Sequence, residues 1–96
     1  MKLDGDARTA HLAPLLANGW VMVEARDAIK KRFVFADFVD AFGWMTQAAI
    51  WAEKLGHHPE WANVYRTVDV TLSTHDSGGL TMLDVQLAEK MDGLAD

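Results

Sequence analysis

The longest regular hydrophobic pattern in the chain covers residues 37–55. Apolar side chains recur there at intervals of three and four residues, the spacing of one face of an α-helix. They form two adjacent stripes, one of Phe38, Phe42, Met45, Ala49 and Ala52 and one of Trp44, Ala48, Trp51 and Leu55. Two stripes are wider than one sheet face needs, so we expect both tryptophans either at the margin of the core or in a contact between copies of the chain. Gly56 ends this helix and Pro59 prevents its resumption.

A shorter helix is predicted before it. Asp4 or Asp6 is placed to cap a helix that runs to about Ala17, with its apolar side formed by Leu12, Leu15 and Leu16. Pro14 falls inside that run, so the helix is expected to bend there or to start late. Asn18-Gly19 is a helix stop.

Strands are predicted on both sides of the long helix. Residues 20–24 and 29–35 flank a turn near Arg26-Asp27, which favours a β-hairpin. After the helix, valine and leucine alternate with polar residues from Val64 to Ser73. This alternation is typical of a strand with one buried and one wet face, in an antiparallel sheet covered by helices on one side.

The C-terminal part of the pattern predicts a loop, a short strand and a last helix. Residues 76–79 form the loop, and Thr81 with Asp84 resembles a capping box ahead of Leu83, Leu87 and Met91. The sequence therefore predicts one α+β domain over residues 1–96, in the order α-β-β-α-β-β-α. We expect an antiparallel sheet of about four strands with three helices packed on one face.

Composition and charge narrow the possible functions. With 96 residues, 50% of them hydrophobic and 24% charged, the chain suits one compact core and is too short for two. A net charge of −5 argues against binding of nucleic acid, and the one basic cluster, Lys30-Lys31-Arg32, fits the solvated faces of a strand. No secretion signal or membrane span is expected, and the absence of cysteine excludes thiolate chemistry. These features fit a cytoplasmic protein.

The candidate chemistry lies in histidines outside the regular elements. His57 and His58 follow a helix end, and His75 follows a strand end. Imidazole titrates near neutral pH and so can give or take a proton at little cost. Glu53 lies four residues before His57, where its carboxylate could orient that ring.

Three interpretations of these histidines follow from the residues alone. Each ring could merely satisfy a turn or a helix end. A metal site is a second interpretation, although adjacent histidines diverge from the backbone and the spacing HExxH is missing, so we expect no metal. The third is metal-free acid–base catalysis on a small substrate. Residue types by themselves do not name that substrate.

Longer motifs resemble a known family. The segments 53–61 (Glu-Lys-Leu-Gly-His-His-Pro-Glu-Trp), 63–65 (Asn-Val-Tyr) and 72–76 (Leu-Ser-Thr-His-Asp) closely resemble the signature of pterin-4a-carbinolamine dehydratases. The likeness extends from about Leu12 to Met91 and takes in further matching positions: Gly19-Trp20, Arg26-Asp27-Ala28-Ile29, Phe33, Phe35, Asp37-Phe38, Ala41-Phe42-Gly43, Gly79-Leu80 and Asp84.

The resemblance implies a carbon–oxygen lyase, a 4a-hydroxytetrahydrobiopterin dehydratase. Such an enzyme converts 4a-hydroxytetrahydropterin to quinonoid dihydropterin and so returns pterin to aromatic amino-acid hydroxylases. It needs no cofactor, because the pterin is the substrate, and it implies a homodimer or homotetramer. Its catalytic positions fall on His57, His58, His75 and Glu53.

The same resemblance places substrate contacts on residues 56–58 and 73–76, which are Gly56, His57, His58, Ser73, Thr74, His75 and Asp76. Gly56 departs from the family, in which Asp or Asn often precedes the histidine pair. We expect His57 and His75 to form the acid–base pair, with His58 mainly holding the pterin and Glu53 orienting His57.

Two questions remain open from the sequence. A straight strand of 17 residues between His58 and His75 would hold them ~56 Å apart at ~3.3 Å per residue. We therefore expect residues 59–64 to double back alongside the long helix. The alternative is a site completed across a subunit interface.

The family also suggests a second function, since a mammalian member serves as a dimerisation cofactor of a transcription factor. The histidines and Glu53 favour the enzyme over such a purely protein-binding function.

Overall fold

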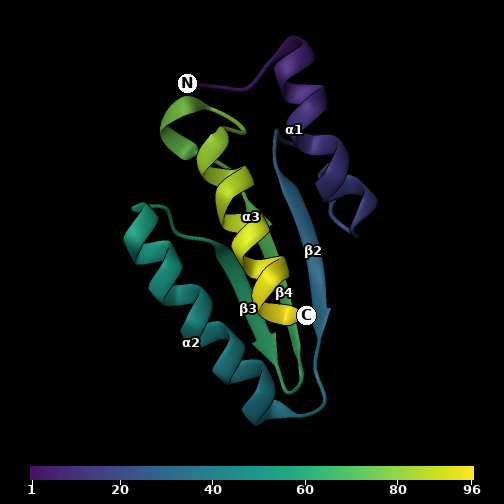
Figure 1. Cartoon of the computed structure of the whole chain (residues 1–96), viewed down its shortest axis with the longest axis vertical. Helices are drawn as coiled ribbons and strands as arrows, with labels where there is room; N and C mark the ends of the chain where they lie inside the picture. Colours follow the sequence, from purple (N-terminus) through teal and green to yellow (C-terminus); the bar gives the residue numbers. More distant parts are fainter.

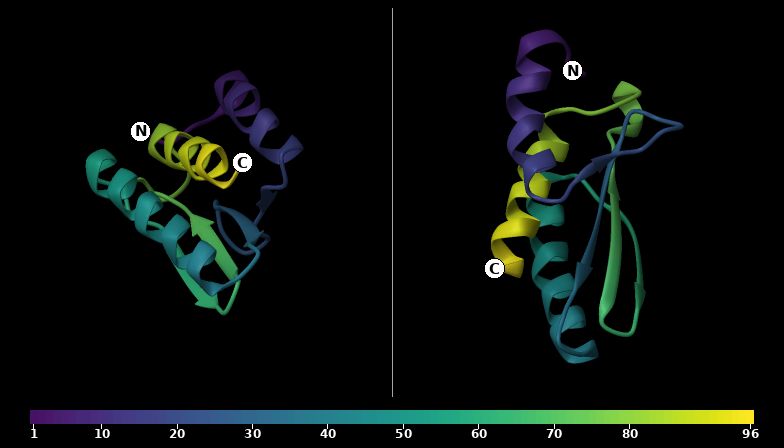
Figure 2. Two further views of the ribbon diagram at one scale, coloured as in Figure 1. Left: turned by 60° about the horizontal axis from the view of Figure 1, so that its bottom comes forward. Right: turned by 90° about the vertical axis from the view of Figure 1, so that its right-hand side faces the viewer.

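The protein folds as three helices on one face of a four-stranded antiparallel sheet, in a computed structural model that describes all residues, 1–96. The elements along the chain are α1 (Gly5–Ala17), β1 (Val21–Met22), β2 (Ile29–Val34), α2 (Phe38–Leu55), β3 (Glu60–Val64), β4 (Thr67–Leu72), the 3₁₀ turn η1 (His75–Ser77) and α3 (Met82–Ala95). The strand order across the sheet is β1-β2-β4-β3 (Figure 1). Figure 2, right, shows the helices as one layer and the sheet as the other. The predicted α+β class and element order are confirmed.

The fourth strand lies elsewhere than predicted. Residues 59–64 do double back, but Glu60–Val64 does so as strand β3, paired with β4 through a turn at Tyr65-Arg66. The segment between β4 and α3 forms the turn η1 and a single bridge from Thr74 to Gly79 instead of a strand. Its four-residue run of small and polar residues cannot extend a sheet, whereas residues 60–64 satisfy the free edge of β4.

Helix α2 buries a face that takes side chains from both of its predicted stripes. Ala41, Trp44, Ala48 and Ala52 are buried, whereas Phe38 and Phe42 are 47% and 55% exposed. Trp44 therefore lies inside the core and not at its margin: its ring centroid is 4.5 Å from that of Phe33, and its Nε1 donates to the carbonyl of Met91. Only Trp51 is at the margin, partly buried against the core cluster. The buried face combines Trp44 and Ala48 of one predicted stripe with Ala52 of the other and with Ala41. Its three alanines allow close approach of α3 and the sheet.

Helix α1 includes Pro14, where a bend or a late start was expected. Helix α1 starts at Gly5 after Asp4, whose side chain makes no capping hydrogen bond, and it continues through Pro14 to Ala17. Leu12 and Leu15 are buried in the core, whereas Leu16 is 41% exposed. None of the three helices has both the length and the hydropathy that crossing a membrane would require.

Asp27, in the loop between β1 and β2, ties three distant segments together. Its carboxylate accepts two hydrogen bonds from Arg8 of α1, at 2.5 and 3.2 Å, and one from the backbone N–H of Leu80. Its carbonyl accepts a hydrogen bond from Ser73 at the end of β4. A side chain at Gly79 would collide with the Asp27 carboxylate, which explains a glycine there. The hydrogen bonds from Arg8 hold the pKa of Asp27 below its usual value, against the opposing effect of partial burial.

We expect Asp27→Asn to lower the free energy of unfolding at pH 7 by about 2 kcal/mol, because it removes a partly buried, charge-assisted pair. A carboxyl whose pKa is lowered by folding stabilises the protein above its unfolded pKa, and this contribution is lost as the pH falls through the folded pKa. The difference between wild type and variant should therefore shrink below about pH 4. Urea denaturation at pH 7 and pH 3 measures this. Asp69→Asn, which breaks an exposed pair with Arg32, is the matched control; an equal loss in both variants would contradict the assigned importance of Asp27.

Candidate functional site

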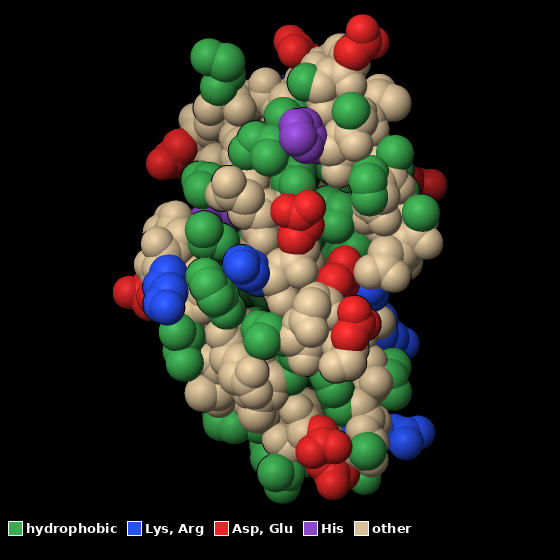
Figure 3. Space-filling view, in the orientation of Figure 1, with side chains coloured by type: hydrophobic (Ala, Val, Ile, Leu, Met, Phe, Trp, Pro, Cys, Tyr) green, Lys and Arg blue, Asp and Glu red, His purple; other side chains and the backbone are tan.

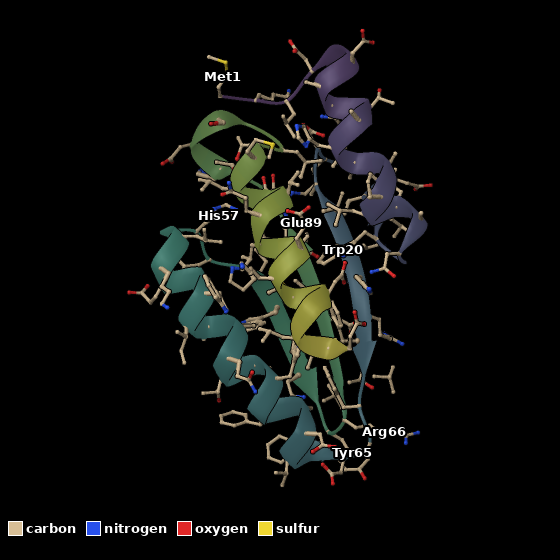
Figure 4. All side chains as sticks on the ribbon, viewed as in Figure 1. Met1, Trp20, His57, Tyr65, Arg66 and Glu89 are labelled. Atoms are coloured by element: carbon tan, nitrogen blue, oxygen red, sulfur yellow. The ribbon has the colours of Figure 1, made fainter.

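The three predicted histidines meet at one cavity of about 300 Å³. Nine residues line it: Gly56, His57, His58, Glu60, Ser73, Thr74, His75, Asp76 and Leu83. All seven predicted substrate-contacting positions are among them, and Glu53 is not. Figure 4 places His57 between the C-terminal end of α2 and the first turns of α3, at the opposite end of the sheet from Tyr65 and Arg66. The β3–β4 hairpin brings the residues together, because it carries the chain away from His58 and back to His75 within one subunit.

The turn at Gly56 directs the histidine pair away from the helix axis. Gly56 caps α2 in the left-handed conformation, with φ 65°, and its N–H bonds to carbonyls of the last helical turn. A Cβ there would meet no atom within 4 Å, so the backbone conformation and not crowding favours glycine. Asp and Asn are the other residues that tolerate this conformation. The departure from the family at Gly56 therefore preserves the backbone path.

His57 is held by the buried carboxylate of Asp84, a residue predicted as part of a helix cap and matching the family, but not as part of the site. Its Nε2 lies 2.5 Å from Oδ1 of Asp84, which is fully buried. The other Asp84 oxygen accepts hydrogen bonds from the N–H of Thr81, at 2.9 Å, and from the hydroxyl of Thr74, at 2.8 Å. A carboxylate surrounded by donors is best satisfied when the third partner is also a donor, so His57 presents Nε2–H to it. Asp84 thus completes the predicted capping box and also orients the ring.

The remaining ring nitrogen of His57 is available to a ligand. Nδ1 makes no hydrogen bond within the chain, and no buried side-chain nitrogen or oxygen lacks a partner, so this atom is accessible. His57 itself lines the cavity although it is 8% exposed as a residue. In this site, Nε2 of His57 is therefore held by Asp84, and Nδ1 of the same ring is open to a ligand.

Glu53 contacts His58 and not His57, which corrects the predicted pairing. Its Oε1 lies 2.6 Å from Nε2 of His58, and the two side chains are 79% and 65% exposed. The prediction applied the four-residue helical spacing across the helix end at Gly56. Because the left-handed turn at Gly56 takes the chain out of the helix, the four-residue relation no longer holds, and His58 is the ring that returns toward Glu53.

His75 stands on the turn η1 on the other side of the cavity. The turn is closed by the bridge between Thr74 and Gly79 and by Gly78 in the left-handed conformation. The ring of His75 is exposed and makes no hydrogen bond to another side chain. It is therefore the least constrained of the three imidazoles.

Glu60 adds a carboxylate that the sequence prediction omitted from the site. It is the first residue of β3 and accepts two hydrogen bonds from Arg26, at 2.8 and 2.7 Å. The hydrogen bonds from Arg26 lower the pKa of Glu60, and the positive form of His75 lowers it further. Glu60 thus places a negative charge in the lining of the cavity that His75 shares.

Comparison with known proteins identifies the family. The family model described as "Pterin 4 alpha carbinolamine dehydratase" matches residues 1–94. This chain belongs to the pterin-4a-carbinolamine dehydratase family. It is 66% identical over 94 residues to a protein of Dinoroseobacter shibae, covering 98% of this chain and 97% of that one, and 67% identical over 94 residues to one of Roseobacter denitrificans, covering 98% and 96%. Both carry the name "Putative pterin-4-alpha-carbinolamine dehydratase".

A solved structure shares the whole fold of this family member. The crystal structure of a transcriptional coactivator/pterin dehydratase from Brucella melitensis is 47% identical, covers both chains completely and superposes with a TM-score of 0.90. No group of three or more His, Cys, Asp or Glu side chains is arranged to hold a metal ion. Two of the three imidazoles are instead each directed to a carboxylate of their own.

The two carboxylate–imidazole pairs should differ sharply in their effect on stability. We expect Asp84→Ala to lower the free energy of unfolding by about 3 kcal/mol, because it removes a helix cap and leaves buried donors without an acceptor. Glu53→Ala should change it by less than about 0.5 kcal/mol, since exposed pairs contribute little. Chemical denaturation of both variants measures this. A loss in Glu53→Ala as large as that in Asp84→Ala would contradict the burial assigned to the two pairs.

Proposed function

We propose that this chain dehydrates 4a-hydroxytetrahydropterin to quinonoid dihydropterin and water by metal-free acid–base catalysis. Its family membership and the convergence of three imidazoles on one cavity support this function. The cavity volume, about 300 Å³, is at the small end of ligand pockets and suits a compact bicyclic ring. The reaction would serve the recycling of tetrahydropterin, with a functional link to an aromatic amino-acid hydroxylase.

His57 is the proposed general base. Its Nε2–H donates to Asp84, so the open Nδ1 carries the lone pair that can accept a proton. When Nδ1 takes that proton, the ring becomes a cation next to a buried carboxylate, which stabilises it. Asp84 acts through His57 and is a positioning residue. The proton comes from a ring nitrogen of the pterin, and the electron pair of that N–H bond forms the new double bond to C4a.

His75 is the proposed general acid. The C4a–O bond breaks as the imidazolium of His75 protonates the departing hydroxyl, which leaves as water. His75 regains its proton from solvent, to which its exposed position gives access, and His57 releases its proton there. Each cycle forms one water molecule and returns both imidazole rings to their starting protonation states. Each well-placed group is worth about 10²–10⁴ in rate.

His58 and Glu53 complete the proposed site by holding the substrate. The Glu53 carboxylate fixes the exposed His58 ring at the mouth of the cavity. Gly56, Ser73, Thr74 and Asp76 are the remaining proposed contacts. The hydroxyl of Thr74 is already hydrogen-bonded to Asp84 and Thr81, and its backbone N–H and carbonyl are hydrogen-bonded to Gly79.

Self-association is proposed from the open face of α2. The exposed apolar residues on this helix are Phe38, Val39, Phe42 and Ile50, with exposed fractions between 47% and 76%. Figure 3 shows hydrophobic side chains at the surface at the lower left, where α2 runs. Such a surface fits a homodimer or homotetramer. A protein-binding function would use the same face, and none of its four exposed apolar residues lines the cavity.

We expect His75→Ala and His57→Gln each to lower kcat by about 10²–10⁴ while the protein stays folded. Glutamine keeps a donor for Asp84, so the buried carboxylate remains partnered. Stopped-flow absorbance of enzymatically generated 4a-hydroxytetrahydropterin, with protein treated with a chelator, measures the rate.

His11→Ala is the control, because His11 lies exposed on α1 and away from the cavity. Unchanged turnover in His75→Ala would exclude the assigned acid, and loss of activity on chelation would exclude the metal-free mechanism. No acceleration by the folded wild type would instead favour a protein-binding function.

A further inference from the structure

The ion pair between Arg26 and Glu60 stands at the edge of the candidate site without an evident structural need. Arg26 comes from the β1–β2 loop and Glu60 opens β3, so the pair spans two segments that are far apart in sequence. Its side chains are 43% and 56% exposed. Exposed pairs of this kind contribute little to stability. The two parallel hydrogen bonds nevertheless fix the position of the Glu60 carboxylate.

The carboxylates around the cavity are not equivalent. Asp84 is bonded to His57 and Glu53 to His58, so neither is free for the third imidazole. The cavity-lining carboxylates that remain for His75 are Glu60, from β3, and Asp76, its neighbour on η1. Asp76 has no partner that orients it, whereas Arg26 holds Glu60 by a two-point contact.

We propose that Glu60 is a positioning residue for His75: its carboxylate favours the imidazolium form of that ring, and Arg26 both fixes Glu60 and limits its effect. This inference rests on the function proposed above, in which His75 must carry a proton before each turnover. The titratable groups that line the cavity with His75 are Glu60, Asp76 and the rings of His57 and His58. Arg26 does not line the cavity, and its contact with the cavity lining is the pair of hydrogen bonds to Glu60.

The two partners of the pair act on His75 with opposite sign. Glu60→Gln removes a negative charge and leaves the positive charge of Arg26, so the imidazolium is less favoured. Arg26→Met removes the positive charge and leaves Glu60 unopposed, so the imidazolium is more favoured. A pair that served only to join the β1–β2 loop to β3 would be broken equally by both substitutions, and both variants would then change in the same direction.

The test is the alkaline limb of the profile of log kcat/KM against pH, which reports the general acid. We expect Glu60→Gln to move this limb to lower pH by about 0.3–0.7 pH units and Arg26→Met to move it to higher pH by a smaller amount, as charges several ångströms away in a solvated site would. The acidic limb, which reports His57, should stay in place in both variants. Raising the ionic strength should reduce both shifts.

Arg32→Met and Asp69→Asn are the matched controls. That pair joins β2 to β4 by two hydrogen bonds, and its side chains are 68% and 52% exposed, but it does not line the cavity. The controls should leave both limbs unmoved. Shifts of the same sign in Glu60→Gln and Arg26→Met, or a rise in KM for Glu60→Gln without any shift, would overturn the proposal.

A titration of the His75 ring protons by NMR in the pterin-free protein separates this proposal from the proposed function. It should show the same opposite shifts in the two variants whether or not the protein accelerates dehydration. Opposite shifts in a protein without dehydratase activity would refute the proposed function and leave the electrostatic assignment standing. Absence of opposite shifts would refute the assignment alone.

Discussion

The Asp84 carboxylate, buried at the N-terminus of α3, is the group on which the site depends. Taking a charge out of water is costly unless every lone pair finds a donor. Here the donors come from three elements: the N–H of Thr81 at the helix cap, the hydroxyl of Thr74 after β4 and the ring of His57 after α2. One buried charge therefore fixes α3, the loop after β4 and the catalytic candidate relative to one another.

Asp27 supports the same region from the other side. Its carboxylate accepts hydrogen bonds from Arg8 of α1 and from the backbone N–H of Leu80, just before the α3 cap. Its backbone carbonyl accepts a hydrogen bond from the Ser73 hydroxyl. The segment from residue 73 to residue 81 is short of regular structure and would be mobile without such anchors. Between them, the two aspartates hold this segment from both ends, so that η1 presents His75 toward the histidine pair at a defined place.

The three imidazoles differ in how firmly they are held, and this difference matches the proposed division of labour. His57 is buried and fixed by a buried carboxylate, which suits a base whose orientation must be constant. His58 is paired with an exposed carboxylate, and His75 has no direct partner and is open to solvent. An acid that must be reprotonated in every cycle benefits from that access, and electrostatic support from Glu60 does not block it.

Features that depend on near neighbours along the chain could be predicted from the sequence. The period of residues 37–55, the stop at Gly56, the Thr81–Asp84 cap and the motif around His57, His58 and His75 are all local, and the structure has each of them. The local pattern left three features open: which side chains of α2 are buried, where the fourth strand lies and which carboxylate binds which imidazole. These depend on contacts between segments up to dozens of residues apart, such as the 27 residues from His57 to Asp84. Periodicity restricts such choices without selecting among them, because two faces of one helix, or two carboxylates near one ring, satisfy the same local rules.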